Sequence, residues 1–486
     1  MFRGFAYVFI LFMFVTSLYM SCLRVSQGSR VIIVPDDYVN LADAVQAAVP
    51  GDVIYLRAGR HILGDKTLVV NKTLSIIGES PLTTIIVGPG YGHELLPLAA
   101  SGVEVKPKYA LLSLWVTPVN LIPIPKAALE VYANNFKISN LTIERCDIGV
   151  VVKGDGTVIM NTIMPSATIT GSNSVIEDNI IWSLSVSGNY NFVMQNHGRV
   201  SFSGSYSLIA MNNGSDLNLQ GSFNIVAGNI FSIISMENAH SNMVCNNSLR
   251  CIWLGMYGHA CSNNTVCKNK LTGPYIWGIL MGTGSHNVFH DNLISNYRME
   301  YSGYGVAIGG YGQIAEYNIF FRNIFMNNNR HVSTNWEVKG AGNLWDNGKV
   351  GNYWDDYEGV DADGDGIGDT PYIVKGVVYS DATGRHVSFI FGVDNYPLIS
   401  PPNIASTPIE WPEWAIPILK LALKAKSNLP IVNVPLLEQN STQQTQLWSP
   451  ESKYSMIWAA AIGGSAVIAA AIALKFRKSK RDYKDV

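Results

Sequence analysis

A short motif with two polar positions recurs through the central part of this chain. In copies such as NIVAGNIF (residues 224–231) and NVFHDNLI (residues 287–294), Asn or a small residue opens the motif, and a second Asn follows five positions later. The apolar residues between them alternate in the manner of a strand with one buried side. Ten closing asparagines, separated by 16 to 31 residues, are Asn140, Asn161, Asn179, Asn196, Asn212, Asn229, Asn247, Asn269, Asn292 and Asn323.

A repeat of this length constrains the fold strongly. A unit of about 20 residues is too short for a helix-strand-helix repeat, but it suffices for one coil of two or three short strands. Coils stacked ~4.8 Å apart bury a continuous core, and Asn at the turns can pair with the Asn of the next coil. The L-x-x-L-x-L frame of a leucine-rich repeat is absent. The sequence therefore predicts an all-β, right-handed parallel β-helix with the ten asparagines in one column.

The solenoid is predicted to fill residues 29–352 and to begin with a cap helix at residues 40–49. Asn40 is the expected N-cap, and Pro50-Gly51 ends the helix. Coils are expected from about residue 52 onward, with an irregular excursion at residues 91–128. Beyond the solenoid we expect an acidic cap segment at residues 353–400 and a Pro-rich stalk at residues 401–455 that contains a short amphipathic helix.

Both ends of the chain indicate export and membrane anchoring. Residues 1–28 combine Arg3 with a long apolar run, which is typical of a secretory signal; an uncleaved signal anchor is the alternative. Residues 456–474 carry no charge and are long enough to cross a ~30 Å hydrocarbon layer. Because residues 475–486 are basic, the tail is expected in the cytoplasm and the body outside. The net charge of -2 argues against a nucleic-acid partner.

Four cysteines lie close together in the repeat region. In an exported domain they favour one or two disulfides over a metal site, because their spacing matches no C-x-x-C pattern. The sequence leaves their pairing open. They are Cys245, Cys251, Cys261 and Cys267.

An acidic loop follows the repeats in the segment DADGDGIGD (residues 361–369). Alternating carboxylates followed by Gly match the demands of a Ca²⁺ ion with six to eight oxygen ligands. The loop is not a complete EF-hand, because Tyr372 stands where the bidentate Glu would be. We expect structural Ca²⁺ on Asp361, Asp363, Asp365, the Ile367 carbonyl and Asp369.

Three stretches together resemble a known family. The opening AVQAAVPGDVIYLRAG, the Asn-bearing coils and the closing GNYWDDYEG, DADGDGIGDTPY and VDNYPL are similar to the NosD-type β-helix proteins, over roughly residues 30–400. The resemblance implies the β-helix fold together with either copper binding or carbohydrate binding and sugar hydrolysis. The C-terminal membrane segment departs from the type member and favours an archaeal surface-protein branch.

The sequence offers no clear catalytic constellation. The Asp36-Asp37 and Asp355-Asp356 pairs lie outside the regular coils, and His290-Asp291 is interpreted as a solvated turn. Copper handling would use Met and His, but no Met-x-x-Met or His-x-His cluster occurs. Copper is therefore not expected.

Aromatic residues indicate a ligand surface instead. Trp253 and Tyr275 lie six residues past their asparagines and Tyr297 lies five past, so near-equal offsets predict one aromatic face, with Trp277, Tyr301 and Tyr304 nearby. Aromatic rings of this kind suit sugar stacking. The leading hypothesis is a cell-surface protein that binds polysaccharide or forms part of the envelope without catalysis. The alternatives are a polysaccharide lyase, hydrolase or epimerase, and a copper-handling accessory protein.

Overall fold

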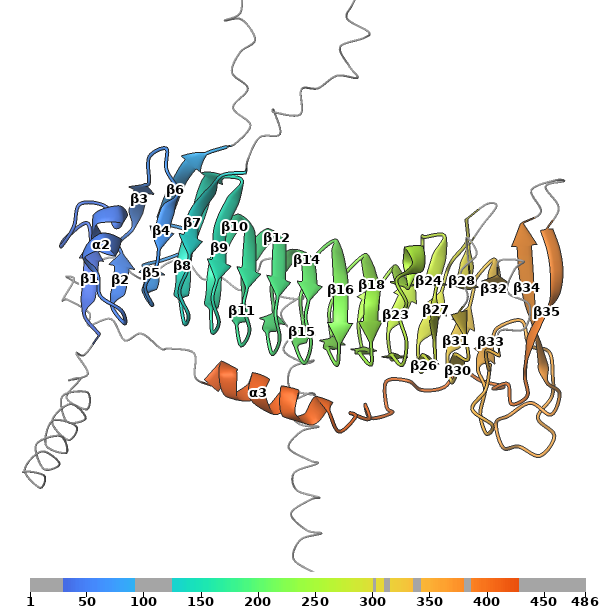
Figure 1. The fold of residues 1–486 in the computed structure, drawn as a ribbon. Coiled ribbons are helices and arrows are strands. Elements are labelled where there is room, and N and C mark those ends of the chain that lie inside the picture. The colour runs from blue at the N-terminus through green and yellow to red at the C-terminus, as the bar shows by residue number, and fades with distance from the viewer. Residues whose placement is uncertain are drawn as a thin grey trace, which may run out of the picture.

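The computed structural model describes residues 29–91, 125–299, 303–309, 315–334, 342–379 and 386–427. These residues form one long stack of parallel β-coils, with the chain advancing along the stack from β1 to β33 (Figure 1). The predicted parallel β-helix is therefore present. The predicted excursion at residues 91–128 falls almost wholly outside the described residues, as do the predicted signal at residues 1–28 and the predicted membrane segment and tail at residues 456–486.

The coils have three faces, although between β14 and β20 they meet on the second face only through isolated bridges at Asn213 and Ile230. The first face consists of short strands, most of them three or four residues long, that pair in parallel with the equivalent strand of the next coil. Its strands are β1 (Val31–Val34), β2 (Val53–Leu56), β5 (Ser75–Gly78), the starts of β8 (Lys137–Cys146) and β10 (Val158–Thr170), β11 (Val175–Glu177), β13 (Phe192–Met194), β15 (Leu208–Ala210), β17 (Ile225–Ala227), β19 (Met243–Cys245), β22 (Thr265–Cys267), β26 (Val288–His290) and β30 (Ile319–Phe321).

The other two faces follow in each coil. The second face holds β3 (Gly59–Ile62), β6 (Thr84–Gly90), the end of β8, β20 (Ser248–Leu249), β23 (Lys270–Thr272), β27 (Leu293–Ser295), β31 (Ile324–Met326) and β33 (Tyr353–Trp354). The third face holds β4 (Leu68–Val70), β7 (Ala127–Val131), β9 (Ile148–Lys153), β12 (Ile180–Ser187), β14 (His197–Ser203), β16 (Asp216–Ser222), β18 (Ile233–His240), β21 (Cys251–Leu254), β24 (Trp277–Met281), β28 (Tyr304–Ile308) and β32 (Arg330–Thr334). Two-residue strands β25 (Gly284–Ser285) and β29 (Ala315–Glu316) pair beside them.

The core is a set of stacked apolar columns. On the first face the middle residue of each short strand points inward, and these residues are fully buried from Ile54 and Ile76 to Val244 and Val266. Toward the C-terminal end the column becomes aromatic, because Phe289 and Phe320 stack with ring centroids 4.5 Å apart. Because apolar residues alternate along each strand, every coil turns its apolar side chains inward, and stacking the coils joins them into one continuous core.

Two elements close the ends of the stack. Helix α2 (Leu41–Ala47) covers the N-terminal end; Asn40 is its N-cap and accepts a hydrogen bond from the Asp43 amide, and its carbonyl end is bound by Lys72 Nζ. At the other end lies the antiparallel hairpin of β34 (Tyr372–Tyr379) and β35 (His386–Asp394).

Helix α3 (Ala415–Ser427) runs alongside the stack (Figure 1). Its Ala415, Ile418, Leu419 and Ala422 are buried in one cluster with outward residues of the first face. We call residues 399–427 the C-terminal strap. The expectation that residues 401–455 form a stalk is wrong for this part, because an amphipathic helix gains more by burying its apolar face on the exposed apolar strands than by standing in water.

Candidate functional site

Eight of the ten predicted asparagines form a column at the corner between the first and second faces. From Asn179 to Asn323, each Nδ2 donates to the Oδ1 of the next asparagine at 2.8–3.1 Å, and the series ends on Asn352. Each Oδ1 also accepts the backbone amide of the preceding asparagine, and each Nδ2 reaches a carbonyl of an earlier coil. Asp394 then accepts the Asn352 amide at 2.7 Å and closes the series.

The prediction is wrong for Asn140 and Asn161, which stand one residue before the column. The column itself continues through Leu141 and Thr162, and Thr162 donates to Asn179 Oδ1. Asn140 and Asn161 have φ values of 57° and 49°, and they bond to each other at 2.8 Å as a separate pair. Their motif fixes a left-handed kink, which Asn tolerates, rather than a buried amide position.

A second ladder, which the sequence interpretation missed, occupies the corner between the third and first faces. Its later members, Asn242, Asn264, Asn287, Asn318 and Asn343, are joined by side-chain hydrogen bonds of 2.9–3.1 Å. The signal was the small residue or Asn that opens each motif five positions before the first ladder; Asn343, nine positions before Asn352, is the exception. The full set is Ser174, Asn191, Ser207, Asn224, Asn242, Asn264, Asn287, Asn318 and Asn343.

The predicted aromatic face does not form. Trp253 lies beside Leu280 on the third face, because the turn around Gly273–Pro274 adds residues and shifts the register of the next coil. Tyr297 is fully buried and donates to the Arg250 carbonyl at 2.8 Å. Trp277 pairs with the buried Tyr304, Tyr275 packs against the core, and Tyr301 lies outside the described residues.

The predicted disulfides are not present. All five cysteines among the described residues are buried free thiols, and the clustered four are split between different faces, except that Cys245 and Cys267 are neighbours in register. The neighbouring Cys245 and His290 side chains lower the pKa of the Cys267 thiol below its ordinary value.

The interpretation of His290-Asp291 as a solvated turn is also wrong. His290 is the last residue of strand β26, and Asp291 is almost fully buried, with its carboxylate held by Arg322 Nε at 2.9 Å.

The acidic loop folds around its own carboxylates. Oxygen atoms of Asp361, Asp363 and Asp365 all lie within 4.8 Å of one another. Asp361 accepts amides of Gly364 and Gly366, and hydrogen bonding from the Gly366 amide holds the pKa of Asp361 below its ordinary value. Asp369 accepts the Ala362 amide at 2.7 Å, and Ile367 donates its amide to Asp365. The predicted ligand residues are therefore close in space.

A cleft of about 400 Å³ at the C-terminal end of the stack holds a second polar cluster. His331, on β32, places Nε2 3.0 Å from Asp355 Oδ1 and 3.3 Å from Asp356 Oδ1. We call this space the C-terminal cleft. It is lined by Asn328, Asn329, Arg330, His331, Val332, Trp354, Asp355, Asp356, Tyr372, Val374 and Lys375.

The electrostatics of the C-terminal cleft follow from these contacts. Burial opposes ionisation of Asp356, but hydrogen bonds and charge from His331 and a 2.9 Å bond from the Tyr372 hydroxyl outweigh it, so its pKa lies below the ordinary value. Burial raises the pKa of Tyr372 far above its usual range. The wall of the cleft behind this cluster is aromatic, because the rings of Trp354 and Tyr372 stack with their centroids 4.4 Å apart. The His331 and Asp355-Asp356 set offers nitrogen and oxygen ligands that could hold a metal ion.

Sequence reasoning set Asp355-Asp356 aside, and the structure shows what was missed. His331 lies on strand β32 of the third face, whereas Asp355 directly follows strand β33 on the second face of the next coil. The two residues are not register partners, because Trp354 pairs with Phe325, so their spacing in the sequence does not indicate the contact.

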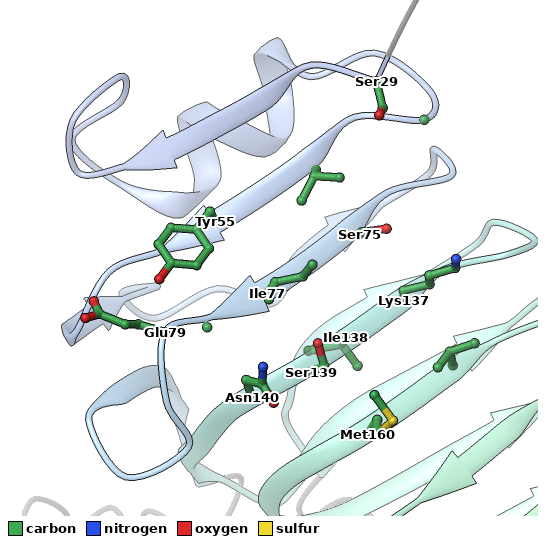
Figure 2. Close-up of a pocket in the computed structure, with 14 residues that line it drawn as sticks. Ser29, Tyr55, Ser75, Ile77, Glu79, Lys137, Ile138, Ser139, Asn140 and Met160 are labelled. Atoms are coloured by element: carbon green, nitrogen blue, oxygen red, sulfur yellow. The ribbon is translucent and has the colours of Figure 1, made fainter. Parts of the chain in front are cut away.

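A second groove lies on the outer side of the first face near its N-terminal end, with a volume of about 460 Å³. Tyr55, Ile77 and Ser139 follow one another on neighbouring strands, and Glu79 and Lys137 lie toward opposite ends (Figure 2). We call it the N-terminal groove. It carries charges of both signs but no cluster of titratable groups.

No helix among the described residues combines the length and the apolar character needed to cross a membrane.

These features define the class: a parallel β-helix protein with internal amide ladders and a polar cleft at the C-terminal end of the stack. Residues 139–359 match the sequence profile of the family described as periplasmic copper-binding protein (NosD). The match confirms the resemblance to NosD-type proteins over the Asn-bearing coils. No curated protein sequence matches the chain.

Several solved structures that are similar to this chain are polysaccharide-degrading enzymes. A PL6 alginate lyase in complex with a trisaccharide has 11% identity and a TM-score of 0.47, covering 77% of this chain and 94% of the lyase. A mannuronic-acid-specific family 6 lyase from human gut microbiota has 12% identity and a TM-score of 0.44, covering 67% and 86%. The catalytic domain of a GH87 α-1,3-glucanase has 13% identity and a TM-score of 0.42, and the chain spans 66% of its length. At these values the likenesses carry no conclusion about activity.

Proposed function

We propose that this protein binds polysaccharide, and that the C-terminal cleft holds the sugar. The observation that carries the proposal is the cleft's lining. The carboxylates of Asp355 and Asp356 offer acceptors for hydroxyl groups beside the Tyr372 ring. Sites for small ligands combine such a wall with a few convergent polar groups.

The charges in the C-terminal cleft favour an acidic sugar. Arg330 and Lys375 line the same space and supply cations for a uronate carboxylate. The carboxylates of Asp355 and Asp356 are already in contact with the His331 ring nitrogen, at 3.0 and 3.3 Å.

Calorimetric titration of the full-length chain with acidic and neutral oligosaccharides tests this proposal. We expect binding of the acidic series and a loss of at least tenfold in affinity in Lys375→Ala. Lys137→Ala is the matched control, because Lys137 is a cation of the N-terminal groove. If Lys137→Ala weakens binding and Lys375→Ala does not, the site assignment is wrong; if no oligosaccharide binds, the function is wrong.

A second candidate function is cleavage of the bound chain. The observation in its favour is that one imidazole nitrogen contacts two carboxylates while the Tyr372 hydroxyl contacts one of them. Such a connected set can accept and return a proton, as a lyase or hydrolase requires. Incubation with acidic polysaccharide should then release unsaturated or reducing ends, and His331→Asn should abolish their release. Binding without new ends would leave only the binding function.

For the acidic loop we propose a structural Ca²⁺ ion held by Asp361, Asp363, Asp365, the Ile367 carbonyl and Asp369. The support is the convergence of three carboxylates in a loop whose amides already fix their orientation. Ligand at 100 times Kd would stabilise the fold by about 2.7 kcal/mol. EDTA should lower the melting temperature of the wild type and leave Asp361→Asn unchanged; an equal response in both would exclude the ion.

We further propose that the body is exported and held at the outer surface of the cell membrane. Residues 1–28 and 456–474 support this by their apolar patterns, and residues 475–486 support a cytoplasmic tail. A chain truncated after residue 455 should appear in the soluble exported fraction, whereas the full-length chain should sediment with membranes and remain accessible to external protease. Sedimentation of both chains would contradict the anchor.

A further inference from the structure

The outward apolar residues of the first face form one long surface, and the C-terminal strap covers only part of it. Helix α3 lies on outward residues from Met243 back to Val175, in one buried cluster. Beyond Val175 the same surface continues as the N-terminal groove, whose described lining contains no residue of the C-terminal strap (Figure 2). Val158 belongs to both parts, because it lines the groove and also packs against the buried cluster. The groove therefore continues the interface that α3 already forms.

The C-terminal strap runs toward this groove. Just before α3, the ring of Trp414 meets that of Phe223 edge-on, with centroids 5.6 Å apart, and the helix then passes β15 toward the N-terminal coils (Figure 1). A helix of 13 residues is about 20 Å long, which equals about four coils at ~4.8 Å each. Counted back from Phe223, in the coil of β17, four coils end at the start of β10. Helix α3 therefore ends beside the rim of the N-terminal groove.

The floor of the N-terminal groove is apolar, and its charges stand at the margins. Its outward apolar side chains come from successive strands and are Val53, Tyr55, Ile77, Val158 and Met160. Glu79 and Lys137 lie toward opposite ends (Figure 2). Such a surface gains free energy when water is excluded from it, and it offers no concentrated charge to a polyanion or a polycation. An uncharged apolar segment is the occupant that it fits.

The sequence after α3 has this character. Residues 428–437 lie outside the described residues, and residues 429–437 read LPIVNVPLL, with one Asn as the only polar residue. Leu429 and Val434 each precede a proline, which disfavours helix and favours extended backbone. At ~3.1 Å per residue, nine extended residues reach about 28 Å. The first face from β11 to β1 is about 24 Å long at ~4.8 Å per coil, so the segment has the length to follow the groove to its end.

We propose that residues 429–437 fill the N-terminal groove and so extend the C-terminal strap to the N-terminal end of the stack. Only Asn428 separates this segment from α3, and a tether that short gives an effective concentration on the order of millimolar. The apolar side chains leave water with the same gain that holds α3 on its strands. The chain then leaves the solenoid at the end opposite the C-terminal cleft. With the membrane anchor proposed above, the cleft faces away from the membrane, where an external polysaccharide can reach it.

Photo-crosslinking of the full-length chain tests the proposal. The probe is Val432→benzoylphenylalanine, and an equal mixture of isotopically heavy and light chains separates links within one chain from links between two. We expect cross-linked peptides that join residue 432 to β2, β5 or β8 of the same chain. The same probe at Gln443, in the polar sequence that follows, is the matched control and should not give these peptides. Links between heavy and light chains would place a second copy in the groove, and links to other elements or to none would likewise overturn the proposal.

Hydroxyl-radical footprinting reads the groove itself. In the wild type, Tyr55 and Met160 should be protected from oxidation by the segment that covers them. Ile431→Asp combined with Val434→Asp should raise the oxidation rate of both residues about threefold or more, because carboxylates lose too much hydration to stay in an apolar groove.

A variant of equal charge controls for the added carboxylates. Thr442→Asp combined with Gln444→Asp places them in the polar sequence and should leave the oxidation rates of the groove residues unchanged. Tyr132, which is exposed, is the internal reference and should oxidise at one rate in all three proteins, which also reports that the coils remain folded. Equal oxidation of the groove residues in all three proteins would overturn the proposal.

Discussion

The central coils and the N-terminal coils of this solenoid have the same two corners, but different kinds of residue fill them. From β11 to β31 the corners are filled by stacked amides, with a few serines, that bond from coil to coil. In the earlier coils the equivalent positions are held by the buried apolar residues Leu74, Phe136 and Leu141. The ladder asparagines are paired from coil to coil, whereas Ser174 Oγ, at the start of the second ladder, is buried without a hydrogen-bond partner.

The difference shows what an amide ladder adds. Apolar corners are held by packing alone, and packing tolerates small shifts of register. A buried amide must find its donors and acceptors on the coils above and below, so a slip of one residue would leave several groups unpaired. The central ladders therefore specify register as well as stability, and four predictions test this comparison.

The largest effect should come from removing one ladder amide. Asn269→Ala removes the acceptor of the Asn247 backbone amide and one hydrogen bond each from Asn247 Nδ2, the Val244 carbonyl and Asn292 Oδ1, all in the core. We therefore expect a loss of about 4 kcal/mol in unfolding free energy. Denaturant unfolding measures it. Asn246→Ala is the control. Asn246 is the exposed residue directly before the ladder residue Asn247, and its substitution should lower the unfolding free energy by about 1 kcal/mol.

The reverse substitution probes the N-terminal coils. Leu141→Asn loses the burial of a core leucine and places an amide opposite Thr162, with no asparagine stack to receive it. We expect a loss of about 3 kcal/mol by the same unfolding measurement. An unchanged unfolding free energy would mean that a corner amide is tolerated in both regions, which would contradict the comparison.

The carboxylate that ends the first ladder should make stability depend on pH. Burial raises the pKa of Asp394 to about 6, above an unfolded value near 3.9, so the folded state binds the proton more tightly. The stabilisation is full below about pH 4 and is lost as pH rises through 6. Between those limits the unfolding free energy should fall by about 2 kcal/mol relative to Asp394→Asn. Parallel pH profiles for the two proteins would refute this origin.

The smallest effect concerns the separate pair. Asn161→Ala removes the half-buried bond to Asn140 and leaves Ala at a φ of 49°, so we expect a loss of about 1 kcal/mol. Asn179→Ala, in the column itself, should cost several times more in the same assay. Equal losses of unfolding free energy in the two variants would mean that Asn161 stabilises the fold as much as a ladder asparagine does.

Much of the architecture was predictable because the sequence repeats it. The Asn-x-apolar pattern predicts the strand, its inward side and the turn of each coil, and eight of the ten predicted asparagines lie in the column. Asn140 and Asn161 could not be placed, since a kink and a buried corner both accept Asn and differ by one residue. The predicted aromatic face was wrong because equal offsets in the sequence place residues on one face only when the turns between them have the same length. The turn at Gly273–Pro274 adds residues and breaks this equality.

The candidate sites depended on contacts between coils. Nothing in the local sequence of His331 indicates the carboxylates of Asp355 and Asp356, because these residues belong to the next coil and a different face.

The sequence by itself determined the repeat, the parallel stacking and the acidic loop, because those depend on alternation and local spacing that every coil restates. Only the tertiary structure decided which coils bond through amides, where the strap packs and which titratable groups meet. Those outcomes depend on the register between coils, which is set by turn lengths and packing across many residues at once.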